Sequence, residues 1–418
     1  MKIYFYTQGC KVNQVETENL KLDAESKNIK VVNTLEESDM VILNSCAVTD
    51  KAVKKFIAFT KKIKKSFPEK KIAITGCGAD LMGQKIKGTA DLIITNAGKT
   101  NIFEYISNES DFITDISTVE HFEEFNETLV KDKTRGYLKI QDGCDSFCSY
   151  CIIPTLRGKP RSRKPENVMT AFKNFIDNGY KEIVLVGIHI GKYGHDIGYS
   201  LKKLLFDLEK VEGDFRIRLS SLEVNEIDDE IIDLVINSNK FCSHFHIPMQ
   251  SGSDKILNLM NRKYTKSDFI KTVSKIKQAD PLASVGSDVI VGFPGEGEDE
   301  FLETEQTIYD SGINYLHVFP YSEREGTGAA SMPHSVPVKI RNERAKHLRQ
   351  ISESLNFNFA KKFFGNNVNI LTEKDNKGLT DNYLESTFLT DIERNIFIKA
   401  KVVSVTFDGN LIVEKING

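Results

Sequence analysis

Short apolar runs alternate with amphipathic stretches through the first hundred residues of the chain. Four of these runs have the form of strands buried on both faces of a parallel sheet: KIYFYT (2–7), DMVILN (39–44), KIAITG (71–76) and DLIIT (91–95). The stretch that follows Cys46 carries an apolar stripe with lysines over its other faces, which predicts an amphipathic helix. The pattern therefore predicts an open parallel α/β sheet over residues 1–112.

A second series of strand-like runs begins near residue 136. Its members are GYLKI (136–140), EIVLVGI (182–188), FRIRLSSLE (215–223), HFHIPM (244–249), SVGSDVIVGF (284–293) and NYLHVFPY (314–321). Helix-length stretches of mixed polar and apolar residues separate them. Six such units fit a parallel barrel, or part of one, better than an open doubly wound sheet. We therefore expect a partial (β/α)6 barrel over residues 131–360.

Two further regions differ in character from these series. Residues 113–130 are polar and acidic without strong periodicity, which predicts a linker. Residues 361–418 contain short β-type runs broken by Gly365, Gly378 and Gly409, which predicts a small antiparallel β module. The chain is thus expected to be α/β, with three domains in sequence order.

Composition excludes several classes of protein. The 56 basic and 59 acidic residues almost cancel, so a polyanionic partner would have to be bound by local clusters. The N-terminus MKIYFYTQGC is not that of a secretory signal, and long apolar runs typical of membrane spans are missing from the sequence. Seven cysteines, an odd number, argue against a disulfide framework. We expect a cytoplasmic protein with reduced thiols and no membrane partner.

Three cysteines follow three of the predicted strands of the first domain. Cys10 comes after YFYTQG, Cys46 after VILNS and Cys77 after IAITG. Because the carboxyl ends of parallel strands meet at one edge of a sheet, the three thiols are expected to lie together. A single buried cysteine would carry little information, but three at equivalent places predict a site that binds a metal.

Three more cysteines lie in one loop after the first strand of the second series. Cys144, Cys148 and Cys151 have the spacing C-x3-C-x2-C within GCDSFCSYC. Zinc is the competing interpretation, but a structural zinc site needs four ligands, and neither a fourth cysteine nor a histidine is nearby. A 4Fe–4S cluster held by three thiolates keeps one iron open to a small molecule. The remaining cysteine, Cys242, has no partner at usable spacing and is expected to be inert.

This loop (143–151), with Tyr150 before its last cysteine, resembles the signature of radical S-adenosylmethionine enzymes, and it is called the radical loop below. Together with the first three cysteines, the segment RGKPRSR (157–163) and the terminal β module, the whole chain resembles the methylthiotransferases of that superfamily. The resemblance implies an N-terminal domain with an auxiliary cluster, a radical barrel and a C-terminal TRAM domain. The two 4Fe–4S clusters would be held by Cys10, Cys46 and Cys77, and by Cys144, Cys148 and Cys151.

The segment TQGCKVNQVETEN (7–19) is similar to the branch of the family that acts on N6-threonylcarbamoyladenosine, with Gln8 and Val15 departing from its pattern. This resemblance implies that a methylthio group is placed at C2 of that nucleoside, at position 37 beside the tRNA anticodon. The radical cluster would bind and reductively cleave S-adenosylmethionine, and the auxiliary cluster would carry the sulfur. An electron donor such as flavodoxin or ferredoxin is implied as a partner, beside the tRNA anticodon stem-loop.

The resemblance also implies contacts to S-adenosylmethionine from successive strand ends. Asp288 stands where the family pattern G-x-I-x-G has a glycine. His244 and His246 alternate on one strand and are as well explained by hydrogen-bonded core positions as by ligand roles. The implied cofactor-binding residues are Tyr150, Gly187, His189, Ser220, Ser221, Glu223, Gln250, Ser251, Ile290 and Gly292.

RNA contact is expected from the basic run at residues 157–164, which follows the radical loop. Some of its arginines have the alternative role of orienting the cofactor carboxylate. The lysine-rich helix after Cys46 is a further candidate, although a solvated helix face is the more common role. The terminal module holds more acidic than basic residues, so it is expected to recognise RNA by shape or by loop bases. The run consists of Arg157, Lys159, Arg161, Arg163 and Lys164.

Three other functions stay open at this stage. A methylthiotransferase of another branch would act on isopentenyladenosine in tRNA or on a ribosomal protein. A non-catalytic iron–sulfur electron carrier would bind clusters without cleaving S-adenosylmethionine. A zinc-dependent RNA-binding protein would contain zinc in place of iron and sulfide.

Overall fold

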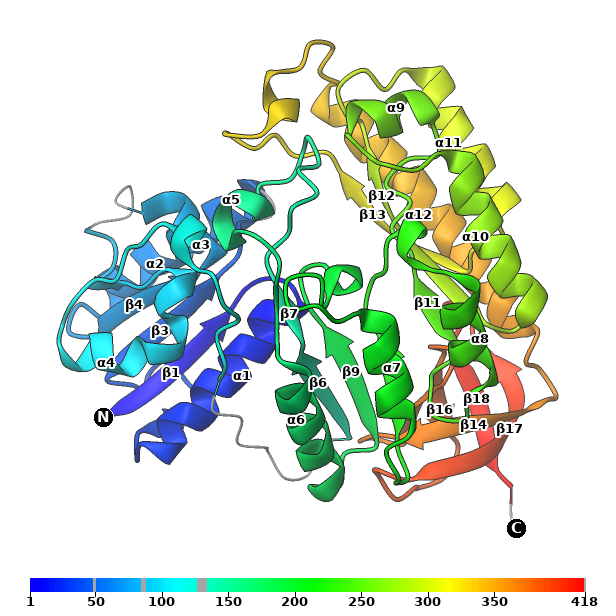
Figure 1. Ribbon diagram of the computed structural model, residues 1–418, viewed down its shortest axis with the longest axis horizontal. Coiled ribbons are helices and arrows are strands. Elements are labelled where there is room, and N and C mark those ends of the chain that lie inside the picture. Colours follow the sequence, from blue (N-terminus) through cyan, green and yellow to red (C-terminus); the bar gives the residue numbers. More distant parts are fainter. Residues whose placement is uncertain (48–49, 84–87, 126–133, 417–418) are drawn as a thin grey trace.

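The computed structural model describes residues 1–47, 50–83, 88–125 and 134–416. Figure 1 shows an N-terminal α/β body beside a central body of parallel strands and helices, with a small C-terminal barrel packed below it. The end of the expected linker and the start of the expected second domain fall in residues 126–133, outside the described residues. Among the described helices, none has the length and apolar character needed to cross a membrane.

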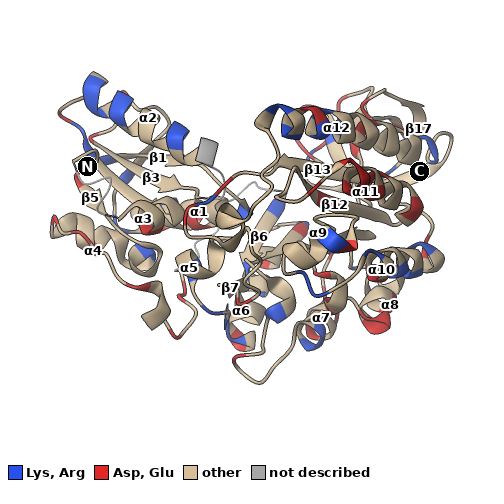
Figure 2. Ribbon diagram, turned by 90° about the horizontal axis from the view of Figure 1, so that it is seen from above, with Lys and Arg blue, Asp and Glu red and all other residues tan. Residues whose placement is uncertain are grey.

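The N-terminal body is a five-stranded parallel sheet with the order β2-β1-β3-β4-β5. Its central strand β3 is buried at every position, as its apolar run predicts. The sequence did not indicate β2, a short and partly exposed edge strand. Lysines lie along the outer helix α2 (Figure 2). The elements are β1 (Lys2–Thr7), α1 (Lys11–Ser26), β2 (Lys30–Val32), β3 (Met40–Ser45), α2 (Asp50–Ser66), β4 (Lys71–Gly76), α3 (Cys77–Met82), β5 (Leu92–Ile93) and α4 (Ile102–Ser107).

The central body confirms the partial barrel. Its six main strands are parallel and follow one another in sequence order, as two three-stranded sheets that meet at a bridge between Ile217 and Phe241. The strands are β6 (Arg135–Lys139), β9 (Glu182–Val186), β10 (Arg216–Leu219), β11 (His244–His246), β12 (Ser284–Val291) and β13 (Tyr315–Pro320). The helices are α5 (Ile153–Arg157), α6 (Pro165–Asp177), α7 (Leu201–Glu209), α8 (Asp229–Asn237), α9 (Asp254–Leu259), α10 (Lys266–Ala279), α11 (Glu298–Ser311) and α12 (Val338–Lys361).

Alternation along these strands separates the helix-facing core from the interior of the barrel. Val285, Val289 and Val291 of β12 belong to the large apolar core. The intervening position Asp288 is partly exposed, in register with His317 of β13. Because side chains alternate between the faces of a strand, the polar positions line the inside of the barrel.

The C-terminal body is a closed five-stranded barrel with the order β14-β15-β16-β18-β17. The expected antiparallel module is correct for four of its pairings, but β16 and β18 pair in parallel. A closed barrel with this odd number of strands requires such an exception, because antiparallel neighbours must alternate in direction. The strands are β14 (Asn367–Thr372), β15 (Lys377–Thr380), β16 (Glu385–Phe388), β17 (Phe397–Val405) and β18 (Leu411–Lys415).

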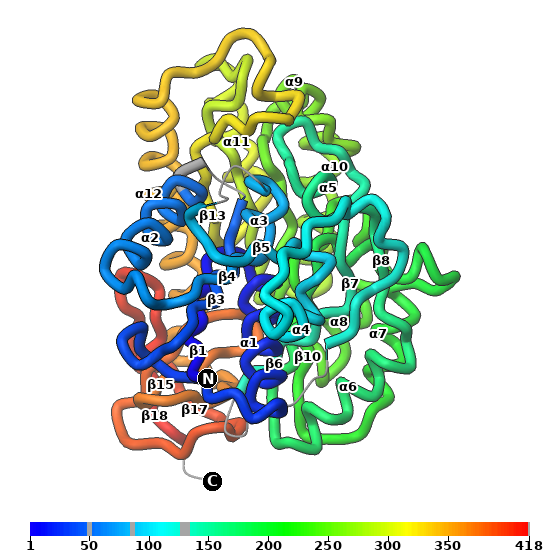
Figure 3. Tube along the Cα trace, turned by 90° about the vertical axis from the view of Figure 1, so that its left-hand side faces the viewer, coloured from blue at the N-terminus to red at the C-terminus, as the bar shows by residue number. Residues whose placement is uncertain are grey.

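This small barrel packs against the amino-terminal end of the central strands (Figure 1), and Figure 3 shows it in orange and red below the N-terminal body. Arg216 donates to the carbonyl of Leu379 at 2.9 Å, and Arg218 donates to the carbonyls of Thr380 at 3.2 Å and Asp381 at 3.0 Å. The opposite ends of the central strands, where ligands bind in such folds, are therefore left to the N-terminal body and to the loops.

At the covered end, the buried carboxylate of Glu182 binds three arginines. Glu182 is fully buried and pairs with Arg216 at 2.6 Å, Arg135 at 2.5 Å and Arg218 at 3.1 Å. Burial would raise the pKa of Glu182, but the three guanidinium groups hold it well below its ordinary value. Cys242 lies in the same region, with its sulfur 3.9 Å from Glu182, and burial raises the pKa of its thiol to about 11.

Candidate active site

The three N-terminal cysteines occupy the carboxyl edge of the parallel sheet. Cys10 lies at the start of α1 after β1, Cys46 directly follows β3, and Cys77 is the first residue of α3 after β4. The strands β1, β3 and β4 are immediate neighbours, so the expected grouping is what the topology produces. Gly76 has φ +87°, and a Cβ there would stand 2.3 Å from Asn44 Oδ1, so only glycine permits this close approach.

Asn13 joins the cysteine-bearing segments. It is 1% exposed, and its Nδ2 donates to the carbonyl of Ser45, next to Cys46, at 3.0 Å. Its Oδ1 lies 3.9 Å from the sulfur of Cys10 as an acceptor. Asn13 was not predicted as a site residue, and the available signal in the sequence is a polar residue three positions after Cys10.

Arg157 reaches into this N-terminal site from the central body. Its Nε donates to the sulfur of Cys77 at 3.2 Å, and its Nη2 donates to Asn13 Oδ1 at 2.8 Å. Burial raises the pKa of the Cys77 thiol, whereas Arg157 and Lys99 favour the thiolate. A guanidinium directed at a sulfur favours the anionic form that iron binding requires.

A buried ion network surrounds Arg157 and joins the two bodies. Glu16 of α1 pairs with Arg157 at 2.8 Å, with Lys139 of β6 at 2.7 Å and with Lys99 at 2.5 Å. Asp142 pairs with Arg157 at 3.0 Å. Burial would raise the pKa of Glu16, but the three cations hold it well below its ordinary value. The network therefore fixes how the N-terminal sheet sits against the barrel.

The second cysteine group lies in the loop between β6 and α5. Gly143 begins the loop with φ +75°, and a Cβ there would stand 2.0 Å from the carbonyl oxygen of Lys159. Ser149 is bound to the end of α9, because its backbone N–H donates to the carbonyl of Met260 and its Oγ donates to the carbonyl of Leu259. Asn261 donates to the carbonyl of Phe147 at 2.9 Å. These bonds fix the loop on the side away from the N-terminal sheet.

Cys144 lies against a histidine–carboxylate pair. Its sulfur is 3.4 Å from Nδ1 of His189, and Nε2 of His189 is 2.6 Å from Glu226. Burial would lower the pKa of His189, but its hydrogen bonds to Cys144 and Glu226 raise it to about 10. The protonated ring favours a thiolate at Cys144, whose pKa is lowered by these contacts although burial opposes them. Sequence reasoning selected His189 and missed Glu226.

Arg262 gives Cys148 a charged neighbour. Its Nη1 donates to the sulfur of Cys148 at 3.1 Å, and its Nη2 pairs with Glu223. Arg262 was not predicted as a site residue, because it follows α9 and lies far along the chain from the loop. Burial raises the pKa of the third thiol, Cys151, to about 12.

Both cysteine groups suit an anionic iron–sulfur cluster. The thiols in each group are free of disulfides. N–H donors contact a sulfur in each group, Arg157 at Cys77 and Arg262 at Cys148. Such donors stabilise the negative charge of cluster sulfurs and tune the reduction potential.

A cavity of about 590 Å³ adjoins the radical loop. Its walls include Cys148, His189, Glu223, Glu226 and Arg262. Ionised groups of both signs face this space, which suits a ligand that carries an amino group and a carboxylate.

The other residues expected to contact the cofactor occupy varied surroundings. Tyr150 and Ile290 pack against one apolar cluster that includes Phe293. Ser251 is fully buried, with its Oγ 3.2 Å from that of Thr304. Two glycines allow close approaches, Gly187 to Gln141 and Gly292 to Arg341. Ser220 donates its backbone N–H to the carbonyl of Leu185, and the hydroxyl of Ser221 bonds to Nδ1 of His246. Gln250 has a left-handed backbone with φ +63°.

In the expected RNA-contacting run, the three arginines are buried and the two lysines are exposed. Arg157, Arg161 and Arg163 are 1%, 4% and 6% exposed, so these side chains are not available to phosphates. Arg161 donates to the carbonyls of Arg157 and Lys159, and Arg163 pairs with Glu124 at 2.7 Å. The expectation of RNA contact is thus wrong for these three arginines in this conformation, because acidic and carbonyl partners draw them inward. Lys159 and Lys164 are exposed.

Comparison with known proteins agrees with this arrangement. Residues 138–308 match the model of the Radical SAM superfamily, and residues 2–96 match Uncharacterized protein family UPF0004. The chain is 37% identical to threonylcarbamoyladenosine tRNA methylthiotransferase MtaB of Bacillus subtilis (strain 168), over 98% of this chain and 95% of that protein. It is 31% identical to tRNA-2-methylthio-N(6)-dimethylallyladenosine synthase of Desulfitobacterium hafniense (strain Y51), over 91% of this chain and 88% of that protein.

A solved structure of similar fold is the radical S-adenosylmethionine methyltransferase TsrM from Kitasatospora setae, with cobalamin and a 4Fe–4S cluster bound. The TM-score is 0.59 at 11% sequence identity, and the match covers 79% of this chain and 77% of that chain. At this identity the likeness concerns the fold alone. It extends over more than the barrel of the central body.

Proposed function

The chain belongs to the radical S-adenosylmethionine methylthiotransferase family, and on that premise we propose that it places a methylthio group at C2 of N6-threonylcarbamoyladenosine in tRNA. The nucleoside is that named for the relative at 37% identity over nearly the whole chain. The segment TQGCKVNQVETEN supports the same branch.

Each cysteine group would hold one 4Fe–4S cluster. Cys144, Cys148 and Cys151 would hold the radical cluster, and Cys10, Cys46 and Cys77 the auxiliary one. When bound, the clusters and S-adenosylmethionine supply one-electron cleavage of the sulfonium and the sulfur that is transferred. The clusters would bind the six cysteine sulfurs as thiolates, and the protein presents charged groups to the cofactor.

The observation that carries the proposal is the contact of Arg157 with Cys77. Arg157 ends the helix α5, which directly follows the radical loop, yet it donates to a thiol of the N-terminal site. Ile152, next to Cys151, packs in one apolar cluster with Cys77. Cys77 thus lies beside the segment that directly follows Cys151, which supports a short path for sulfur transfer onto a carbon radical.

Charged groups around the cofactor cavity suit the methionine end of S-adenosylmethionine. Glu223 and Glu226 would attract the ammonium group, and Arg262 the carboxylate. The apolar cluster around Tyr150 and Ile290 would receive the adenine. The remaining polar strand-end residues would position the cofactor between these two regions.

The anticodon stem-loop would approach beside the radical loop, with position 37 turned toward the barrel. Exposed Lys159 and Lys164 would contact its phosphates, and the lysines along α2 (Figure 2) are a second candidate for RNA contact. The C-terminal TRAM domain would contact RNA by shape. A flavodoxin or ferredoxin would deliver the electron, and the reaction would occur in the cytoplasm.

Mass spectrometry of tRNA nucleosides tests this function. The chain is expressed in a bacterium that lacks its own methylthiotransferases, beside a Cys148→Ala control. We expect 2-methylthio-N6-threonylcarbamoyladenosine to appear with the intact chain and not with the control. Methylthiolation of isopentenyladenosine alone, or of no nucleoside, would overturn the assignment.

A further inference from the structure

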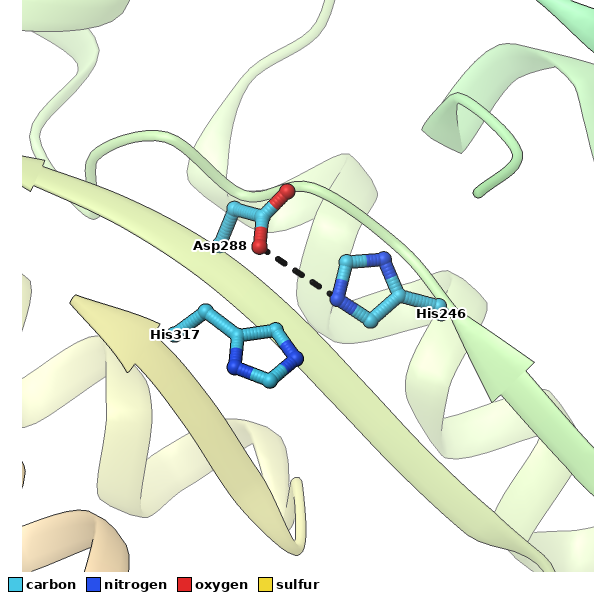
Figure 4. A group of neighbouring side chains, drawn as sticks. All are labelled: His246, Asp288 and His317. Carbon is cyan, nitrogen blue, oxygen red and sulfur yellow. Dashed lines mark ion pairs between the residues drawn. The ribbon is translucent and has the colours of Figure 1, made fainter. Parts of the chain in front are cut away.

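Three side chains of types that can bind metals meet in the central body, apart from the six cysteines. His246 of β11, Asp288 of β12 and His317 of β13 place one ligand atom each within 4.8 Å of one another. Figure 4 shows the three side chains projecting from adjacent strands toward a common space. Nε2 of His246 lies 3.4 Å from Oδ1 of Asp288.

The ring of His246 is oriented but its inner nitrogen has no hydrogen-bond partner. Nδ1 is 2.8 Å from Oγ of Ser221, which fixes the ring. Nε2 is buried and makes no hydrogen bond with any described group, although Asp288 is close. A buried polar atom without a partner is costly, so its position needs an explanation. Histidines that bind metals characteristically use one nitrogen for the metal and the other for an orienting hydrogen bond.

The spacing requires little movement to accept an ion. Ligands about 2.0–2.2 Å from one zinc ion in tetrahedral geometry lie about 3.4 Å apart. The pair formed by His246 and Asp288 already has this separation. His317 is exposed and its ring centroid lies 5.4 Å from that of His246, so a change in its side-chain torsions would bring the third ligand atom to the ion.

We propose that His246, Asp288 and His317 bind one divalent transition-metal ion, for which Zn²⁺ is the natural probe. Two imidazoles and one carboxylate form a set that Zn²⁺ accepts with a fourth position left to water or to a substrate oxygen. Mg²⁺ and Ca²⁺ prefer oxygen ligands and do not suit two imidazoles.

The site would lie where the barrel opens toward the C-terminal body. His317 and Tyr315 line a groove of about 920 Å³, whose other wall includes Lys377, Tyr383 and Glu385 of the small barrel. The open coordination position would therefore be accessible from this groove. An oxygen-bearing ligand would enter there without passing the cysteine groups.

Metal analysis of the cluster-loaded chain tests the proposal. The protein is equilibrated with excess Zn²⁺, desalted and analysed for zinc and iron together. We expect about one zinc per chain beyond the iron, and at least a tenfold loss of retained zinc in Asp288→Asn and His317→Gln with unchanged iron. His121→Gln, which removes an exposed histidine elsewhere, is expected to keep the zinc.

A hydrogen-bonded group that binds no metal, or zinc bound by cysteines, would give equal zinc in the intact chain and in all variants. Either result would overturn the proposal. Because His317 is exposed, its variant is expected to fold, and thermal unfolding followed by circular dichroism checks this. Ser221→Ala adds a milder case, since loss of the orienting bond is expected to weaken zinc binding about tenfold. The readout is metal content, so it is independent of methylthiotransferase activity.

Discussion

Arg157 donates from its Nε to the sulfur of Cys77 at 3.2 Å, although the two residues belong to different bodies of the protein. The same guanidinium reaches Glu16 of α1 and Asp142 of the barrel. One side chain therefore links the auxiliary cysteine group, the helix that carries Asn13 and the segment after the radical loop. The buried ion network therefore determines how the two cysteine groups are placed relative to each other.

Replacing Arg157 with Met is expected to lower both stability and the iron content of the auxiliary site. Removing one partner of a buried ion pair typically costs about 3–5 kcal/mol, and Lys99 and Lys139 would still face Glu16, so we expect about 3 kcal/mol. Denaturant unfolding and iron analysis measure the two effects. Lys159→Met, an exposed neighbour, is the control, and equal behaviour of both variants would contradict the account.

Replacing Arg262 with Gln is expected to lower the reduction potential of the radical cluster. The guanidinium lies 3.1 Å from the sulfur of Cys148, and a positive charge stabilises the more negative, reduced cluster. We expect a fall on the order of 60 mV, the one-electron equivalent of a tenfold change in equilibrium. Redox titration followed by electron paramagnetic resonance measures it. Arg262→Lys, which keeps the charge, should retain most of the potential; a Gln variant with an unchanged potential would refute the role.

Replacing Glu182 with Gln is expected to destabilise the barrel, because three arginines would lose their buried anion. The expected cost at neutral pH is about 3–5 kcal/mol. Since the folded pKa of Glu182 lies below its unfolded value, its stabilising effect is complete above about pH 4.3 and is lost as the pH falls toward the folded pKa. The difference between the two proteins should therefore shrink in acid.

Urea unfolding at several pH values measures that difference. Glu212→Gln is the matched control, because Glu212 is exposed, and we expect it to change stability by less than about 0.5 kcal/mol. A Glu182 variant as stable as this control at neutral pH would show that the buried network contributes nothing.

Replacing Lys159 and Lys164 together with Met is expected to weaken binding of an anticodon stem-loop. Each phosphate contact to single-stranded RNA contributes about 0.7 to the slope of log K against log salt, so the slope should fall by about 1.4. Fluorescence anisotropy at several salt concentrations measures it. Lys210→Met with Lys346→Met, two exposed lysines elsewhere, should leave the slope unchanged. A slope unaffected by the first pair would remove these lysines from the RNA surface.

Local patterns were sufficient to predict most of the fold. The apolar runs identified strands such as β3, which is buried throughout, and the six parallel units of the central body. The edge strand β2 escaped detection because it is short and half exposed. The parallel pairing of β16 with β18 depends on closure of the small barrel, which no local pattern reports.

The candidate site was predictable where strand ends determine it. Cys10, Cys46 and Cys77 follow the carboxyl ends of β1, β3 and β4, which are neighbours in the sheet. Arg157 was expected at the surface, since a basic run normally faces solvent, but Glu16 and Asp142 draw it inside. Such partners are distant in sequence, and the same is true of Arg262 at Cys148. Pairings between residues so far apart follow from tertiary structure and not from spacing.

The separate loss of each cysteine group tests the central claim most directly. Two triple variants replace Cys10, Cys46 and Cys77, or Cys144, Cys148 and Cys151, with Ala. We expect about four irons in each variant against about eight in the intact chain. With reductant and S-adenosylmethionine, the first variant should still form 5′-deoxyadenosine without methylthiolated tRNA, and the second should form neither. Full iron content in either variant, or methylthiolated tRNA from the first, would contradict the account.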